Sequence, residues 1–378
     1  MRRWGLLLML GRPAAPEPCG VAVWCLEDVD CSFEQLPVVE QYDGVTYTVP
    51  YYSSAGDIMA AGADSGAELA LIVSHGAVPN PGGYFCAGMD AVVAQSGVDP
   101  GRVIVIAPWY LGSGADTEPT PSQLQWTAGA HAPLSGDWRD GGDSDPAGGR
   151  PGNVSSYRVI DIIVERLLLS GAFPSLRGAV LWGDSAGGQV LARYALATHL
   201  PAQATQRLRI FPSNPSSFPY LDSRRWNYTF PDERCTLGEF RELDDEQLRA
   251  CPGADQWRYG VAGLLPPYVV AGLDLARFPT LAVTYLQGTL DVCNEDGSCG
   301  TERCPSGGLD RGCAAMLQGP MRLWRGRQYK AALDVYYGEE PLAPRLLELP
   351  GVGHDAYEVA RAQPFLAAAF EDWGGVAT

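Results

Sequence analysis

One stretch of the sequence decides the fold: Gly178-Ala179-Val180-Leu181-Trp182-Gly183-Asp184-Ser185-Ala186-Gly187-Gly188. Its first half is short and apolar, which predicts a buried strand, and its second half is compatible with a helix. The G-x-S-x-G pattern between them is typical of a turn so tight that the serine backbone is strained and its hydroxyl stands at the end of the strand. Ser185 is therefore a candidate nucleophile. The alternative is a strand-to-helix turn with an incidental serine, because the pattern also occurs by chance.

Apolar runs on both sides of this stretch predict the rest of a sheet. Continuous apolar runs are typical of strands that are buried on both faces, as in parallel sheets. Strands are expected at residues 45–49, 67–74, 102–107, 208–211, 280–286 and 345–349, and helices near 90–95, 159–169 and 187–198. This order predicts an α/β protein with a mostly parallel, doubly wound sheet.

The alternation of strands and helices stops between residues 212 and 278, a segment rich in aromatic residues that we interpret as an inserted cap. The core then has a first part, 19–211, and a second part, 279–378. At the N-terminus, Arg2 and Arg3 precede a short apolar stretch, so residues 1–18 resemble a signal peptide.

Cysteine usage also points to export. The chain has ten cysteines and none in a C-x-x-C pair, which favours disulfides in an oxidising compartment over a zinc site. Local pairing is expected between Cys235 and Cys251, and within 293–313. The sequons at Asn153 and Asn227 are possible glycan acceptors. A secreted or otherwise extracytoplasmic location is predicted.

Charge and composition exclude several classes of partner. The formal net charge of −17 argues against nucleic acid and anionic membrane surfaces. No run of 18 apolar residues is present, so stable membrane insertion is not expected. Four aspartates within 137–145 do not have the spacing of a calcium loop, and we interpret them as a solvated acidic loop. We expect no metal and no cofactor, and the oligomeric state stays open.

A serine nucleophile needs a general base, normally histidine, and the chain has four. His199 lies at the far end of the helix that begins at the serine, about 20 Å away at 1.5 Å per residue. His131 lies in a glycine-rich loop without supporting context, and His75 suits a loop that binds the oxyanion. His354 follows the last buried strand and precedes a helix, which makes it the predicted base.

The base in turn needs a carboxylate that fixes its tautomer. Asp291 follows the preceding strand through a glycine turn and is the predicted acid. Glu295 and Asp296 in the same loop are alternatives.

Two backbone N–H groups are expected to bind the oxyanion that forms at the reacting carbonyl group. One is that of Ala186, and the other belongs to Gly76 or Ala77, after the strand at 67–74. Trp109 and Tyr110 follow the strand at 102–107 and are candidates for substrate binding, with an ordinary core position as the alternative.

From about Val45 to its end, the chain resembles the α/β-hydrolase superfamily. The resemblance rests on the strand-to-helix turn at 183–188, here called the elbow, and on the order Ser185, Asp291, His354. This is the order of the catalytic triad in these enzymes. The elbow sequence also occurs in hormone-sensitive-lipase-like esterases. Those esterases carry His-Gly-Gly-Gly where this chain has the sequence His75-Gly76-Ala77-Val78-Pro79. The segment 313–320, together with Arg322, Arg325, Gly326 and Tyr329, resembles uncharacterised secreted hydrolases.

These features predict a secreted serine hydrolase that cleaves a carboxylic ester of a small molecule through an acyl-enzyme. A peptidase or an acyltransferase uses the same constellation and stays an alternative. A second alternative is a non-catalytic secreted binding protein on a hydrolase scaffold.

Overall fold

The structure is a computed structural model that describes residues 33–63, 66–112, 119–127, 137–226, 239–292, 308–338 and 344–373. Several sequence predictions fall outside these ranges: the leader at 1–18, His131, the Asn227 sequon, Cys235, Glu295 and Asp296.

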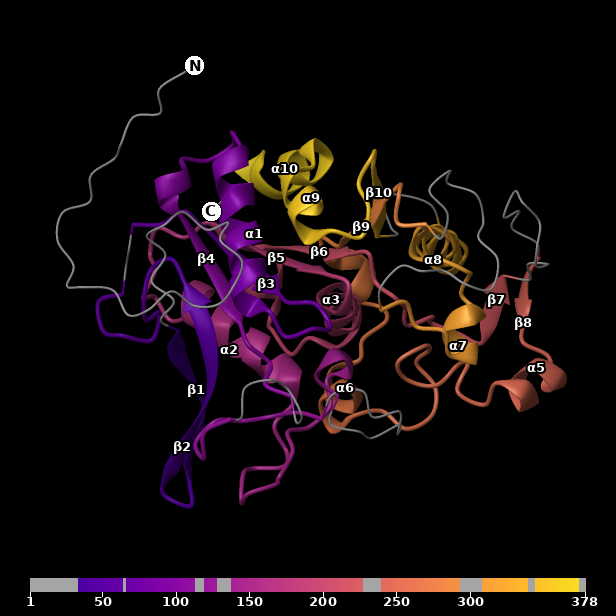
Figure 1. Cartoon of the computed structure of the whole chain (residues 1–378), viewed down its shortest axis with the longest axis horizontal. Coiled ribbons are helices and arrows are strands. Elements are labelled where there is room, and N and C mark those ends of the chain that lie inside the picture. Colours follow the sequence, from indigo (N-terminus) through magenta and orange to yellow (C-terminus); the bar gives the residue numbers. More distant parts are fainter. Residues whose placement is uncertain are drawn as a thin grey trace.

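A central sheet positions the rest of the molecule (Figure 1). Among the described residues it has eight strands in the order β1-β2-β4-β3-β5-β6-β9-β10. Strand β2 pairs antiparallel with both β1 and β4, and the remaining pairs, from β4 to β10, are parallel. The bounds are β1 Glu34–Tyr42, β2 Val45–Ser53, β3 Leu69–Ser74, β4 Val103–Pro108, β5 Gly178–Asp184, β6 Leu208–Ser213, β9 Thr284–Gly288 and β10 Arg345–Leu349. The predicted mostly parallel α/β sheet is therefore confirmed.

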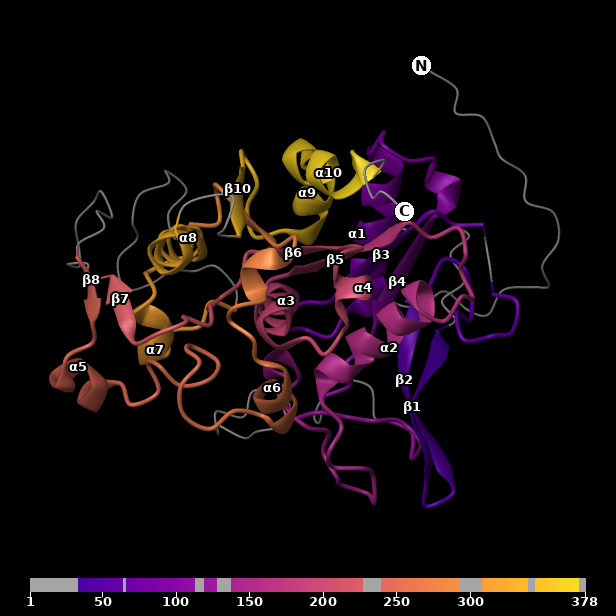
Figure 2. The same cartoon turned by 180° about the vertical axis from the view of Figure 1, so that it is seen from behind.

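Helices cover both faces of the sheet (Figures 1 and 2). On β3, Ala70 and Ile72 belong to one core cluster, and Leu71 and Val73 belong to the other. The first cluster lies under α2 (Ser156–Leu168), α3 (Ala186–Ala197) and α8 (Arg322–Tyr337). The second lies under α1 (Pro81–Ala94), α9 (Ala356–Arg361) and α10 (Gln363–Phe370). Burial on both faces explains why these strands are continuous apolar runs.

Two excursions leave the sheet near its carboxyl edge. The first, between β6 and β9, holds the two-stranded sheet of β7 (Arg224–Trp226) and β8 (Phe240–Glu242) with α5 (Asp245–Ala250) and α6 (Pro267–Gly272). It covers the segment predicted as a cap. The second, between β9 and β10, holds α7 (Cys313–Met316) and α8. Figure 1 shows α5, α7, β7 and β8 together at one side of the molecule, away from the sheet, and we call these four elements the lobe. A short helix, α4 (Ala202–Thr205), precedes β6.

A disulfide between Cys251 and Cys313 joins the two excursions. The expected pairing of Cys251 with Cys235 is therefore wrong, as is a partner for Cys313 within 293–313. The prediction paired cysteines that are close in the sequence. The bond instead joins residues 62 positions apart, because the second excursion folds against the first. Cys86 is also disulfide-bonded. No helix among the described residues is long and apolar enough to cross a membrane.

Candidate active site

Ser185 lies at the turn between β5 and α3 in a conformation that is rare for a side-chain-bearing residue. Its φ is 58° and its ψ is −113°, outside the favoured regions for L-residues. Hydrogen bonds hold this backbone on both sides. The Ser185 N–H donates to the Ser213 carbonyl at 3.0 Å, and the Gln189 N–H donates to the Ser185 carbonyl at 3.0 Å. The strain that the sequence pattern predicts is thus present, and hydrogen bonds to β6 and α3 hold it.

Close packing explains the glycines around the serine. A Cβ on Gly183 would lie 2.6 Å from the backbone carbon of Gly187. A Cβ on Gly187 would collide with the Ser74 carbonyl oxygen and lie 2.9 Å from the His75 carbonyl oxygen. These separations are shorter than a carbon atom tolerates, so only glycine lets the start of α3 approach the end of β3.

His354 lies between Ser185 and Asp291 and contacts both. Its Nε2 is 3.0 Å from Ser185 Oγ, and its Nδ1 is 2.8 Å from Asp291 Oδ2. A carboxylate only accepts hydrogen bonds, so Nδ1 carries the proton and Nε2 is free to accept one from the serine hydroxyl. The structure brings together the three residues that the sequence analysis selected.

Pairing between β9 and β10 sets the position of the acid and the base. Gly288 at the end of β9 is opposite Leu349 at the end of β10. Beyond the strands, the Thr289 N–H donates to the Leu349 carbonyl at 3.0 Å, and the Leu290 N–H donates to the Val352 carbonyl at 2.8 Å. The two loops are therefore joined before they reach Asp291 and His354.

A buried polar cluster that was not predicted from the sequence lies directly beside the serine. The Asp184 carboxylate accepts hydrogen bonds from Ser213 Oγ at 2.8 Å and from Asn214 Nδ2 at 3.0 Å. Burial raises the pKa of the Asp184 carboxyl, opposed in part by the nearby His354. Asp184 was visible as the second residue of the G-x-S-x-G pattern, but its partners lie at the end of β6 and directly after it.

Besides His354, Asp291 has a cationic neighbour. The guanidinium of Arg322, at the start of α8, lies 3.5 Å from Asp291 Oδ1, and both side chains are buried. In the sequence, Arg322 stands out only through the family resemblance, because no local pattern connects it with the acid.

The loop after β3 is held by His75. The ring Nε2 accepts a hydrogen bond from the Tyr110 N–H at 3.1 Å, so Nδ1 is the protonated nitrogen and donates to the Gly76 carbonyl at 2.8 Å. Burial lowers the pKa of His75 to about 4. The imidazole is therefore neutral, which matches its predicted place in an oxyanion loop better than a role as base.

Gly76 and Ala77 differ in what surrounds them. Gly76 is buried against the Tyr84 hydroxyl, toward which its N–H is directed. Ala77 is exposed. Because the carbonyl of the Gly76–Ala77 peptide faces His75, the N–H of the same planar trans peptide points the opposite way, out of the loop. The Ala186 N–H, in the first turn of α3, has no acceptor within its own helix.

Comparisons with known proteins agree with this architecture. No family model matches the chain, and no curated protein sequence matches it. The structure is similar to that of poly(aspartic acid) hydrolase-1 from Sphingomonas sp. KT-1, with a TM-score of 0.54 and 19% identity over 90% of this chain and 98% of that chain. The chain has the α/β-hydrolase fold. A lower similarity, with a TM-score of 0.48 and 18% identity, links it to LpqC, a poly(3-hydroxybutyrate) depolymerase from Bordetella parapertussis, over 87% of this chain and 88% of that chain.

The two aromatic candidates for substrate binding occupy different environments in this α/β-hydrolase fold. Tyr110 is fully buried, with its ring stacked on Trp138 at a centroid distance of 5.0 Å and tilted against His75 at 5.6 Å. These are the contacts of a core side chain, the alternative noted above. Trp109 is only partly buried, with its ring 5.8 Å from that of Phe33.

The acidic segment 137–145 is not the solvated loop that its composition indicated. Asp137 and Asp140 are both buried. Arg139 is bidentate to Asp137, and Arg258 lies 3.0 Å from Asp140. Burial would raise the pKa of Asp137, but Arg139 and Arg258 hold it below its ordinary value. Arg258 comes from the first excursion, so local composition could not reveal the pairing. Among the described residues no cluster of His, Cys, Asp and Glu is able to hold a metal ion.

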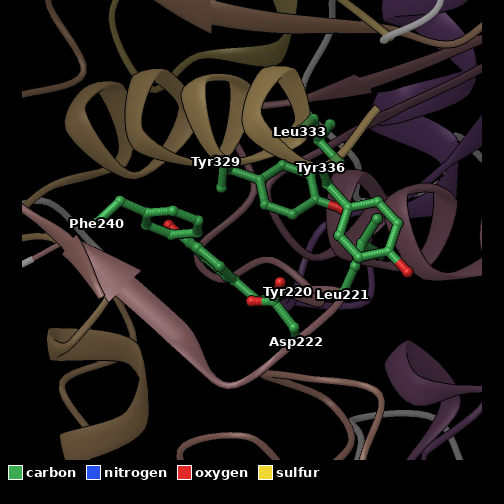
Figure 3. A pocket seen from close by; sticks show the side chains of 8 residues that line it. Tyr220, Leu221, Asp222, Phe240, Tyr329, Leu333 and Tyr336 are labelled. Atoms are coloured by element: carbon green, nitrogen blue, oxygen red, sulfur yellow. The ribbon is translucent and has the colours of Figure 1, made fainter. Parts of the chain in front are cut away.

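A small pocket between β8 and α8 lies away from the three triad candidates. Figure 3 shows Tyr329 and Tyr336 of α8 facing Phe240 and the segment that leads into β7. The pocket walls contain none of Ser185, Asp291 and His354. We therefore do not propose this pocket as the active site.

Proposed function

We propose that the protein is a serine hydrolase that cleaves carboxylic esters through an acyl-enzyme. The observation that carries this proposal is the hydrogen-bonded chain from Ser185 through His354 to Asp291, with the serine in a strained turn. A free serine hydroxyl is a weak nucleophile at neutral pH, and an imidazole within hydrogen-bond reach activates it.

Each residue has one role in acylation. Ser185 Oγ attacks the ester carbonyl carbon while its proton passes to His354 Nε2. Asp291 keeps the proton on Nδ1 and stabilises the imidazolium. His354 then protonates the leaving alkoxide, and the alcohol departs. In deacylation His354 takes a proton from the water that attacks the acyl carbon, and it returns this proton to Ser185 Oγ as the bond to the acyl carbon breaks and the acid leaves.

The Ala77 and Ala186 N–H groups supply the oxyanion hole in this proposal. Ala77 is favoured over Gly76 because it is exposed and its N–H points away from His75, whereas the Gly76 N–H faces Tyr84. Two such donors stabilise the tetrahedral oxyanion because the charge develops where the donors already point. The segment 212–278, which makes up most of the first excursion, is proposed as the cap over the substrate.

Covalent labelling tests the nucleophile. A fluorophosphonate probe is expected to label the wild-type protein once per chain and to leave Ser185→Ala unlabelled. Ser170→Ala, an exposed serine at the end of α2, is the matched control and keeps the label. A folded wild-type protein that is never labelled favours the alternative of a non-catalytic binding protein on this scaffold.

Substrate panels separate ester hydrolysis from its alternatives. We expect turnover of p-nitrophenyl esters of graded acyl length, falling by about 10⁴- to 10⁶-fold in Ser185→Ala. Faster cleavage of peptide anilides indicates a peptidase. Transfer of the acyl group to an added alcohol in preference to water indicates an acyltransferase.

An extracytoplasmic location is part of the proposal. The disulfide-bonded cysteines at positions 86, 251 and 313 suit an oxidising compartment. Mass spectrometry of the exported protein is expected to show that residues 1–18 are absent, and a protein that accumulates reduced in the cytoplasm contradicts this part.

A further inference from the structure

The carboxylate of Asp291 is occupied on both oxygens. Oδ2 accepts the hydrogen bond from His354 Nδ1, and Oδ1 faces Nη1 of Arg322 at 3.5 Å. Asp291 is 2% exposed and Arg322 is fully buried. A charged pair that is removed from water is stable only when each charge meets its partner in a fixed geometry. The arrangement therefore restricts rotation of the carboxylate about its own bond.

The start of α8 adds a second contact to the same residue. The Leu323 N–H donates to the backbone carbonyl of Asp291 at 3.4 Å. This helix has 16 residues, and the amino end of a helix carries partial positive charge that favours a carboxylate. Side chain and main chain of Asp291 are thus both held by α8, an element of the second excursion.

A second buried arginine fixes this end of α8. Arg325, on the same face as Arg322, donates from Nε to the Gly319 carbonyl at 2.8 Å and from Nη2 to the Asp310 carbonyl at 2.9 Å. It also donates to the Ser216 carbonyl of the first excursion. The position of Arg322 is therefore set by backbone groups of both excursions.

The electrostatic effect of Arg322 has a definite sign. Other ionisable groups lie near the Asp291–His354 pair. They are Asp184 of β5, Tyr84 of α1, and Asp355 and Glu358 at the start of α9. The carboxylates among them favour proton uptake by the Asp291–His354 pair. A cation beside Asp291 opposes that uptake, since the extra proton adds positive charge. Removal of this cation is therefore expected to move the acid limb of the activity profile to higher pH.

We propose that Arg322 is a positioning residue for Asp291, which it holds in the orientation that binds His354. This inference rests on the proposed function of the Ser185–His354–Asp291 chain. It assigns Arg322 no contact with the substrate. It connects the first turn of α8 to the proposed acid, although this helix lies far from Ser185 in the sequence.

Substitution of Arg322 tests the proposal through the pH profile of ester hydrolysis. Arg322→Gln is expected to lower kcat about 10- to 100-fold with little change in KM, because a small misplacement of a catalytic group has effects of that size. The acid limb of the kcat profile is expected to move to higher pH. Arg322→Lys restores the cation and is expected to recover the position of the acid limb and part of kcat.

Arg327→Gln is the matched control on the same helix. Arg327 pairs with Glu348 at 2.6 Å with both side chains about one-third exposed, and its removal is expected to leave kcat and the pH profile unchanged. A fall in kcat for Arg322→Gln that follows loss of folded protein, with the acid limb in place, overturns the proposal. If Arg322→Gln does not fold, the Arg322→Lys variant provides the test. An acid limb that lies one pH unit or more from its wild-type position, although the cation is retained, overturns the proposal.

A double-mutant cycle shows whether Arg322 acts through Asp291. The measured quantity is the rate constant for labelling by a fluorophosphonate, which stays measurable in slow variants. In an Asp291→Asn background, Arg322→Gln is expected to have no further effect, and independent effects overturn the inference. Failure of the proposed function is distinct, because in that case the wild-type protein is not labelled at all.

Discussion

The side-chain carbonyl of Asn214 accepts a hydrogen bond from the backbone N–H of Gly288 at 2.9 Å. The amide of the same side chain donates to Asp184 at 3.0 Å. One buried asparagine therefore joins the strand that ends in the elbow to the strand that leads to Asp291. This link fixes the distance between the proposed nucleophile and the proposed acid through a neutral, rigid group.

Asn214→Gly is expected to lower the free energy of unfolding by about 3 kcal/mol, since the buried Gly288 N–H and the Asp184 carboxylate each lose a partner. Glycine keeps the backbone relaxed at the positive φ of 44°. Asn214→Ala adds strain at that φ, so it is expected to be less stable than Asn214→Gly. Urea unfolding measures both variants. Equal stability of the wild-type and Asn214→Gly proteins contradicts a structural link.

Gly187→Ala is expected to reduce esterase activity by about 100-fold or more, because its Cβ displaces the start of α3 from the end of β3. The same overpacking is expected to destabilise the protein by about 1–3 kcal/mol. Gly253→Ala is the control, because a Cβ there meets no atom within 4 Å. Activity assays and thermal unfolding of both variants check the prediction, which fails if the two substitutions have equal effects.

His75 is expected to make stability depend on pH. Its pKa is about 4 in the folded state and about 6.5 in an unfolded chain. The unfolded state then binds more protons between these values, so stability rises from pH 4 to pH 6.5 and is lost as the pH falls through this window. The contribution is about 3 kcal/mol at most. Urea unfolding at several pH values is expected to show a smaller slope for His75→Gln, and an unchanged slope contradicts the neutral, buried imidazole.

The sequence predicted those parts of the fold whose signal is local. Continuous apolar runs gave the inner strands, and the three triad candidates each follow a strand at the same edge of the sheet. Helix α1 was predicted only near its carboxyl end, because its first eight residues contain three glycines. One of them, Gly88, is required by packing: a Cβ there would lie 2.9 Å from side-chain atoms of Val73 and Val105. Helix formation at these glycines depends on the sheet beneath them.

The remaining features depend on contacts between distant segments. Arg322 meets Asp291, Arg258 meets Asp140, and Cys251 meets Cys313 only after the two excursions fold against the core and each other. Charged residues with no periodicity indicate a solvated surface when they are read locally. Here arginines are buried because carboxylates and backbone carbonyls from other elements surround them, which a single sequence does not reveal.

Removal of the Cys251–Cys313 disulfide is expected to destabilise the protein by up to about 4 kcal/mol, from the entropy of the 62-residue loop that it closes. Cys251→Ser and Cys313→Ser each break the same bond. The double variant is therefore expected to be as stable as either single variant, instead of showing the sum of two effects. Chemical unfolding of all three variants makes the comparison. Additive losses indicate that each cysteine stabilises the lobe in some other way, and the double variant then loses about twice what a single one loses.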